Sequence, residues 1–195
     1  VEDLEYHQGN FQVKGTRVGI GIFDLCSRQS GNSISVKRKK ELTGRSWPNG
    51  CHVAEVEIDA ETGEVRLDRY VSVDDVGNTV NPMIVHGQVQ GGIASGLGQA
   101  VLERTEYDAS GQLLSGSYMD YALPRADDMP SLSGSLFEKA PCLTNPLGAK
   151  GTGEIGAVAG PPAIVHAVID ALAEKGITQV DMPLQPQKIW ECLNR

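Results

Sequence analysis

The chain has 195 residues, of which 40% are hydrophobic, and it carries a formal net charge of -8 at pH 7. This length can bury the core of one ordinary domain, and the acidic balance argues against a nucleic-acid surface, since the basic run 37–40 is short enough to be a solvated loop. The longest apolar stretch, residues 84–102, is interrupted by polar side chains, so we expect no membrane span and a cytoplasmic protein. The four cysteines form no C-x-x-C pair and the four histidines lack ligand-like spacing, so reduced thiols and no protein-bound zinc or iron–sulfur cluster are expected.

The first fifty residues are expected to form an incomplete lobe or a loop. Residues 1–13 alternate loosely and predict two strand halves joined by a turn at Gly9 and Asn10. Residues 18–25 are a second short apolar segment. Residues 27–50 are polar, basic and punctuated by glycine, which predicts a long connection or a mobile loop.

The next segment predicts a hairpin followed by an unusual helix. Apolar residues recur before and after a turn at 59–63, and Asn81 and Pro82 are typical of a helix cap and first turn. Residues 87–98 of this helix are rich in glycine, which costs up to ~1 kcal/mol per residue relative to alanine. Something must therefore pack very close to the helix. The neighbour is either another element of the same protein or a large cofactor, toward which Gln88 would offer a donor and an acceptor.

The remaining elements complete an α+β pattern. A second hairpin is predicted over residues 104–117 with its turn at 108–111, and a further strand over 132–137. An amphipathic helix is predicted over 161–175, ended by Gly176, and a short last helix over 186–193. Hairpins and a mixed sheet packed with a few helices are typical of α+β proteins rather than of a regular βαβ repeat.

A glycine-rich loop at residues 148–156 holds one acidic side chain, Glu154. Glycines let the backbone approach a bulky ligand, and a carboxylate held among them is expected to be partly desolvated, as suits a proton acceptor. Residues 151–156 also match the G-x-G-x-x-G pattern of dinucleotide-binding folds, but no buried strand is predicted before them. From the loop alone, a ligand-binding loop and a purely structural glycine loop are equally supported.

Four linked motifs carry a family resemblance. They are Gly-Gln-Val-Gln-Gly at 87–91, Gly-Leu-Gly-Gln at 96–99, the segment 116–124 and the segment 145–154. In this order and spacing the chain resembles the C-terminal part of the molybdopterin-binding large subunit of the xanthine dehydrogenase, aldehyde oxidase and aerobic carbon monoxide dehydrogenase family. The resemblance covers essentially the whole chain, most clearly residues 49–190, so a single C-terminal molybdopterin-binding domain over 1–195 is expected.

The resemblance implies roles for individual residues. Glu154 matches the family's catalytic base, which takes a proton from the hydroxyl ligand of molybdenum before that oxygen attacks an electron-poor C–H carbon. Gln88 matches a glutamine that hydrogen-bonds the pterin, and Gly151 and Gly153 match positions whose backbone lies against the cofactor. Lys150 lies beside them and is included among the cofactor-binding residues, with a solvent-facing side chain as the alternative.

The resemblance also implies a larger enzyme. Such an oxidoreductase carries a molybdopterin-type molybdenum cofactor, hydroxylates an aldehyde, an N-heterocycle or a similar small substrate, and works with iron–sulfur and FAD subunits. Family large subunits are several times longer, so the chain is expected to be a fragment, a split-gene subunit or a separately produced last domain. Alone it should be inactive and hold no cofactor, and it should self-associate or bind the missing N-terminal half. The competing hypothesis is a non-catalytic fragment or assembly domain.

Overall fold

The computed structural model describes residues 2–39, 41 and 44–194. The chain divides into two compact units, Val1–Glu41 and Leu42–Arg195. The division falls within the connection that the sequence predicts at residues 27–50. Across the described residues, no helix has both the length and the apolar character needed to cross a membrane.

The N-terminal unit is a small antiparallel sheet followed by a short helix. Its elements are β1 (Leu4–His7), β2 (Asn10–Val13), β3 (Gly19–Gly21), α1 (Ile22–Ser27) and the 3₁₀ turn η1 (Ser30–Asn32). The predicted strand pair is confirmed, but its turn lies one residue earlier, because Gln8 and Gly9 adopt φ values of 46° and 84°. The apolar segment 18–25 divides between β3 and α1. None of the described residues of this unit is buried.

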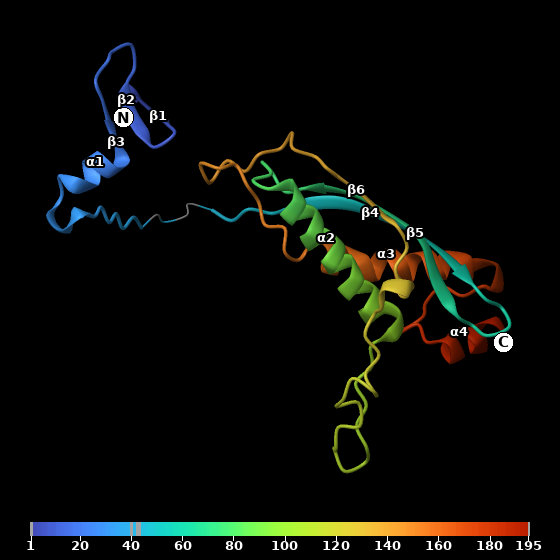
Figure 1. Cartoon of the computed structure of the whole chain (residues 1–195). Helices are drawn as coiled ribbons and strands as arrows, with labels where there is room; N and C mark the ends of the chain where they lie inside the picture. Colours follow the sequence, from blue (N-terminus) through green and yellow to red (C-terminus); the bar gives the residue numbers. More distant parts are fainter. Residues whose placement is uncertain (1, 40, 42–43, 195) are drawn as a thin grey trace. The chain divides into compact units, whose positions relative to one another are not determined.

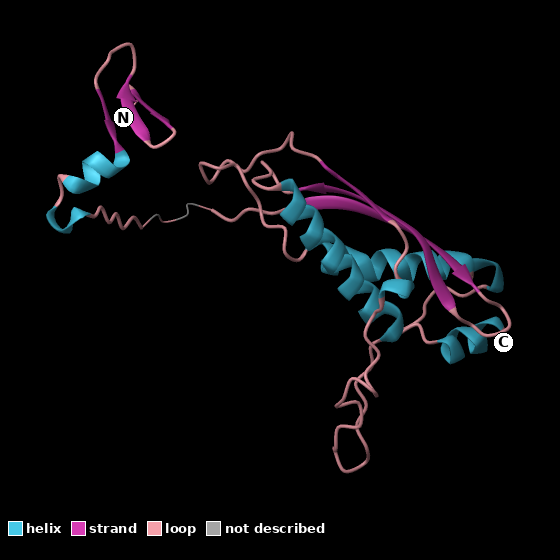
Figure 2. Ribbon diagram, viewed as in Figure 1, coloured by secondary structure: helices cyan, strands magenta, loops and turns pink. Residues whose placement is uncertain are grey.

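The described residues of the C-terminal unit form a three-stranded mixed sheet and the α-helices α2, α3 and α4 (Figure 2). The strands are β4 (Asn49–Ile58), β5 (Val65–Asp75) and β6 (Leu132–Leu136), in the order β4-β5-β6, with β4 antiparallel and β6 parallel to β5. The helices are α2 (Pro82–Leu97), α3 (Ile155–Ala171) and α4 (Pro186–Leu193). Short helical turns are η2 (Gly98–Leu102), η3 (Ala126–Asp128) and η4 (Ala173–Lys175). The α+β class and the hairpin predicted around the turn at 59–63 are confirmed.

The core lies between the sheet and the helices. Helices α2 and α3 lie side by side and α3 contacts β4 and β5 (Figure 1). Tyr70 of β5, Ile93 of α2 and Ile164 of α3 are all at most 2% exposed. Helix α4 adds the buried Ile189 to the same cluster. Burial of these large side chains supplies most of the stabilisation of such a unit, at roughly 25 cal/mol per Å² of apolar surface.

Helices α2 and α3 approach each other through glycines. A Cβ at Gly92 would lie 2.8 Å from the backbone nitrogen of Ala157, and one at Gly96 would lie 3.1 Å from Cα of Gly160. A Cβ at Gly156 would overlap the carbonyl oxygen of Val89. The close approach predicted from the glycines of α2 is therefore confirmed, and the neighbour at these positions is another helix of the same protein.

Two adjacent glycines of α2 give a matched test of this contact. We expect Gly92→Ala to destabilise the chain by about 1–3 kcal/mol, because its methyl group would meet backbone atoms that cannot move independently. Gly91→Ala has open space around its Cβ and should stabilise the chain by up to ~1 kcal/mol through helix propensity. Urea unfolding measures both. Equal effects of the two substitutions would contradict the proposed packing.

The start of α3 differs from the prediction. The sequence predicts a helix from residue 161, whereas α3 begins at Ile155 and includes Pro161 and Pro162. Each proline removes one backbone donor, so the carbonyls of Ala157 and Val158 lose their usual helical partners. The helix continues through the prolines because its first turns are packed against α2. Helix α3 also ends earlier than predicted, at Ala171 instead of residue 175, and the predicted stop at Gly176 (φ of 73°) caps the separate 3₁₀ turn η4.

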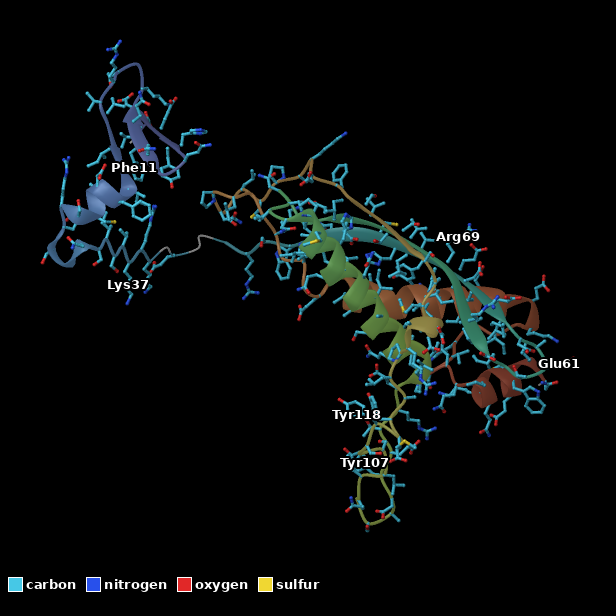
Figure 3. All side chains as sticks on the ribbon, viewed as in Figure 1. Phe11, Lys37, Glu61, Arg69, Tyr107 and Tyr118 are labelled. Atoms are coloured by element: carbon cyan, nitrogen blue, oxygen red, sulfur yellow. The ribbon has the colours of Figure 1, made fainter. Side chains whose placement is uncertain are left out.

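The predicted hairpin over 104–117 is largely wrong. Only one isolated bridge, between Tyr107 and Leu113, is formed there in the described chain. The turn itself is ordered, since Asp108 accepts hydrogen bonds from the backbone of Ser110 and Gln112. Figure 3 shows Tyr107 and Tyr118 on a segment that projects from the body of the unit. Two strands without a sheet or helix to cover them are marginal, which explains the short pairing.

Candidate functional site

A groove in the C-terminal unit contains most of the site residues predicted from the sequence. It encloses about 570 Å³ and is bounded by the segment that enters β4 and by the loop that enters α3. The lining residues are 46–50, His52, residues 151–155, Val158 and Ala159. Gly151, Gly153 and Glu154 thus lie in one groove. Its second wall was not predicted from the sequence, because residues 46–50 fall in the segment 27–50 that was expected to be a connection or a mobile loop.

Glu154 lies at the start of α3 and lines the groove. It is the N-cap residue, and its carbonyl oxygen accepts a hydrogen bond from Val158 N at 2.9 Å. Its side chain makes no capping hydrogen bond and is exposed. The expected partial desolvation of this carboxylate is therefore wrong for the described chain, because the groove covers it from one side only.

The glycine loop is fastened to the end of β5. Asn78 N donates to Gly148 O at 2.9 Å, and Lys150 N donates to Val76 O at 2.7 Å. Gly77 has φ of 66°, and a side chain there would overlap the carbonyl of Gly148. These contacts hold the stem of the loop, whereas a Cβ at Gly151 would have nothing within 4 Å. The loop is therefore held at residues 148–150 by hydrogen bonds, and its backbone at Gly151 is exposed to the groove.

Lys150 is held away from solvent by an ion pair. Its Nζ lies 2.6 Å from Asp75 Oδ2, and the two side chains are only 10% and 11% exposed. Burial alone would raise the pKa of Asp75, but hydrogen bonds from Lys150 and from Gly77 N, together with the charge of Lys150, lower it below its usual value. The alternative of a solvent-facing Lys150 is therefore wrong. Its ammonium group is used within the protein, and Lys150 does not line the groove.

Gln88 lies on α2 beside the glycine loop. Its Nε2 is 3.7 Å from the position that a Cβ of Gly153 would occupy. The side chain is exposed, and its amide has no hydrogen-bond partner among the described residues. Gln88 does not line the groove itself but borders the loop that does. The structure thus brings Gln88, Gly153 and Glu154 into one neighbourhood, although they are up to 66 positions apart in sequence.

A buried hydrogen-bonded network lies at the β4 side of the groove. His52 Nε2 is 2.9 Å from Asp74 Oδ1, and His52 Nδ1 is 2.9 Å from the hydroxyl of Tyr70. The tautomer with its proton on Nε2 satisfies both contacts, since Nε2 then donates to Asp74 Oδ1 and Nδ1 accepts from the Tyr70 hydroxyl. Burial, and then the nearby Asp74 charge, raise the pKa of Tyr70 well above its usual value, which keeps it a donor. His52 was also not predicted from the sequence, because no local motif identifies it.

The groove residues are compatible with a pterin-type ligand. Thr152 lines the groove, and its buried hydroxyl has no partner within the part of the chain that the structure describes. Gly151 leaves room for a ligand against the backbone, and Gln88 offers a free amide close by. A polar ring system needs such groups along one edge. By contrast, no strand leads into residues 151–156 in the described chain, so the dinucleotide alternative lacks its required context.

Comparison with known proteins establishes the family. The model of the molybdopterin cofactor-binding domain matches residues 1–130. The chain is 32% identical over 200 residues to the 6-hydroxypseudooxynicotine dehydrogenase complex subunit gamma of Paenarthrobacter nicotinovorans, covering 97% of this chain and 25% of that protein. It is 37% identical over 148 residues to the carbon monoxide dehydrogenase large chain of Hydrogenophaga pseudoflava, covering 76% of this chain and 18% of that protein.

Solved structures support the same family assignment. Quinoline 2-oxidoreductase from Pseudomonas putida 86 superposes with a TM-score of 0.84 at 32% identity, covering 100% of this chain and 26% of that one. The chain belongs to the molybdopterin cofactor-binding domain family, within the large subunits of the molybdenum hydroxylases. The resemblance predicted from the sequence is thereby confirmed. The chain spans about a quarter of the length of the first of these relatives.

Proposed function

We propose that this chain forms one wall of the molybdenum cofactor site of an oxidative hydroxylase and supplies its general base, Glu154. The observation that carries the proposal is the groove, where the Glu154 carboxylate lies beside the bare backbone of Gly151 and Gly153. When bound, the cofactor would supply the oxygen to be transferred and accept two electrons from the substrate. Glu154 would accept the proton that the attacking oxygen must lose, a step that a carboxylate performs well when it has no competing partner.

The remaining residues would hold the cofactor. The Gln88 amide can both donate to and accept from a pterin edge, and the loop at Gly151 and Gly153 can lie flat against it. The Thr152 hydroxyl would gain the partner that it lacks among the described residues. Lys150, whose ammonium is paired with Asp75, is proposed to serve the cofactor by holding the base of this loop.

The complete enzyme would contain more than this chain. Since the groove covers Glu154 from one side, the rest of a large subunit would close the site, and iron–sulfur and FAD subunits would carry the electrons away. The substrate would be an aldehyde, an N-heterocycle or a similar small molecule. Alone, the chain is proposed to hold no molybdenum and to have no turnover. The competing proposal, a non-catalytic assembly domain, lacks a reason for the free Glu154 and Gln88 side chains beside one groove.

The cofactor role is tested by Gln88→Ala in the complete enzyme. We expect lower molybdenum content after dialysis, with near-normal turnover per remaining molybdenum, because an amide can anchor a pterin but cannot serve as the base. Gln90→Ala on the same helix is the matched control and should retain wild-type metal content. Molybdenum is measured by elemental analysis. Equal molybdenum content in both variants would show that Gln88 does not hold the cofactor.

A further inference from the structure

We propose that Trp47 forms an aromatic wall of the groove and stacks on a planar heteroaromatic ring bound beside Glu154. The inference rests on the proposed function and adds a residue that selects the shape of the ligand. Trp47 lines the groove together with Glu154, yet 68% of its surface is exposed. An indole carries a large apolar surface and a π face, so a ring that covers it gains both burial and a stacking contact.

The segment that carries Trp47 is held in place. Pro48 follows Trp47 directly, which restricts Trp47 to extended backbone, and Asn49 Nδ2 donates to Trp47 O at 3.4 Å. Strand β4 begins at Asn49, and a Cβ at Gly50 would lie 2.7 Å from Asp74 Oδ1, so the strand start is pressed against β5. A wall with restricted freedom loses little entropy when a ligand binds.

The buried network fixes the same strand. His52 is bonded through both ring nitrogens, to Asp74 and to Tyr70, and its side chain is only 2% exposed. His52 has no spare polar atom for a ligand, so we assign it a positioning role. The network ties β4 to β5 five residues beyond Trp47.

The surroundings of Trp47 favour a flat ring over a charged or flexible ligand. Pro48, Ile155 and Val158 add apolar surface to the groove, and Val158 is 69% exposed. Both walls also carry polar residues, Ser46 and Asn49 beside Trp47, and Thr152 and Glu154 on the opposite loop. A planar heteroaromatic ring satisfies both sides, since its face meets Trp47 and its nitrogen and C–H edge meet the loop. Two sources share this chemistry, the substrate ring and the pterin.

The experiment uses the chain labelled with ¹⁵N and records the indole N–H signals. Trp47 and Trp190 give two such signals, and Trp190→Phe identifies that of Trp47. Quinoline serves as the substrate-like probe, pterin as the cofactor-like probe, and decahydroquinoline as the non-planar control. We expect a saturable shift of the Trp47 signal with at least one planar probe and no saturable shift with decahydroquinoline. A saturable shift with quinoline and not with pterin would show that Trp47 contacts the substrate ring. A saturable shift with pterin and not with quinoline would show that it contacts the cofactor.

Variants test whether the contact is aromatic and lies in the groove. Trp47→Leu should weaken binding of the active probe roughly two- to tenfold, measured by equilibrium dialysis, and Trp47→Phe should weaken it less. Gly151→Val, which extends into open space in the groove, should abolish the Trp47 shift. Absence of a saturable shift with both planar probes, or equal binding by wild type and Trp47→Leu, would overturn the proposal.

Failure of this inference can be told from failure of the proposed function. Glu154→Gln removes the base but leaves the apolar wall intact, so the Trp47 shift should persist in that variant. A normal Trp47 shift together with unchanged turnover of Glu154→Gln would contradict the role of Glu154 as general base and would support Trp47 as the aromatic wall. Loss of turnover in Glu154→Gln, with no Trp47 shift in the wild type, would contradict the role of Trp47 and would support Glu154 as the general base.

Discussion

In the complete enzyme, Glu154→Gln is expected to lower turnover per bound molybdenum by at least ~100-fold, the usual loss for a missing general base. Glutamine retains the shape of the side chain but cannot accept the proton. The substitution should leave the fold unchanged, because the Glu154 side chain makes no capping hydrogen bond at the start of α3. Molybdenum content and stability should therefore match the wild type.

Glu174→Gln is the matched control for this prediction. Glu174 is also exposed but lies in η4, outside the groove, so its substitution should leave turnover unchanged. Steady-state rates divided by the molybdenum content of each preparation give the comparison. Near-normal turnover of Glu154→Gln would mean that the base lies elsewhere, and the glycine loop would then be explained as a structural turn.

Removing the cation of the buried ion pair is expected to have the largest effect on stability. Lys150→Met should cost about 3 kcal/mol of unfolding free energy at neutral pH, because it leaves the Asp75 charge buried without its partner. Methionine keeps most of the apolar stem, so the loss of the charge dominates. Lys139→Met, at an exposed position, should have little effect.

The pH dependence of this loss gives an independent check. The pKa of Asp75 is lowered by folding, so the pair contributes its stability fully above the unfolded value of about 3.9 and loses it as pH falls through the folded value. The difference between wild type and Lys150→Met should thus be largest above about pH 4 and shrink below it. Urea unfolding at several pH values measures this. A variant with wild-type stability but reduced molybdenum content would instead favour direct cofactor binding by Lys150.

The sequence predicted those parts of the fold that depend on local signals. The β4–β5 hairpin follows from alternation and a turn, and the cap at Asn81 is observed with its side chain accepting from Ile84 N. The glycines of α2 predicted a close neighbour but not which one. Gly92 and Gly96 meet α3, whereas Gly87 and Gly91 face open space, and this division depends on the helix pairing.

The errors arose where tertiary contacts override local rules. Proline normally ends a helix at the preceding residue, yet α3 extends six residues before Pro161 because those residues pack against α2. Glu154 was expected to be desolvated by its own loop, but covering a side chain requires a second surface. Trp47 and His52 were not predicted as site residues because they line the groove together with Glu154, which is about a hundred positions away in sequence. An aromatic residue directly before a proline at a strand start was the available signal.

The two walls of the groove come from distant parts of the chain, since Gly151 follows His52 by 99 positions. No single hairpin or helix pair contains both walls, so the groove forms only when the C-terminal unit as a whole has folded. Such long-range contacts form late in folding because loop-closure entropy must first be overcome. A molecule that binds the groove would thus stabilise the entire unit by mass action rather than one element. Cutting the chain between the walls would abolish binding even where the separate helices persist.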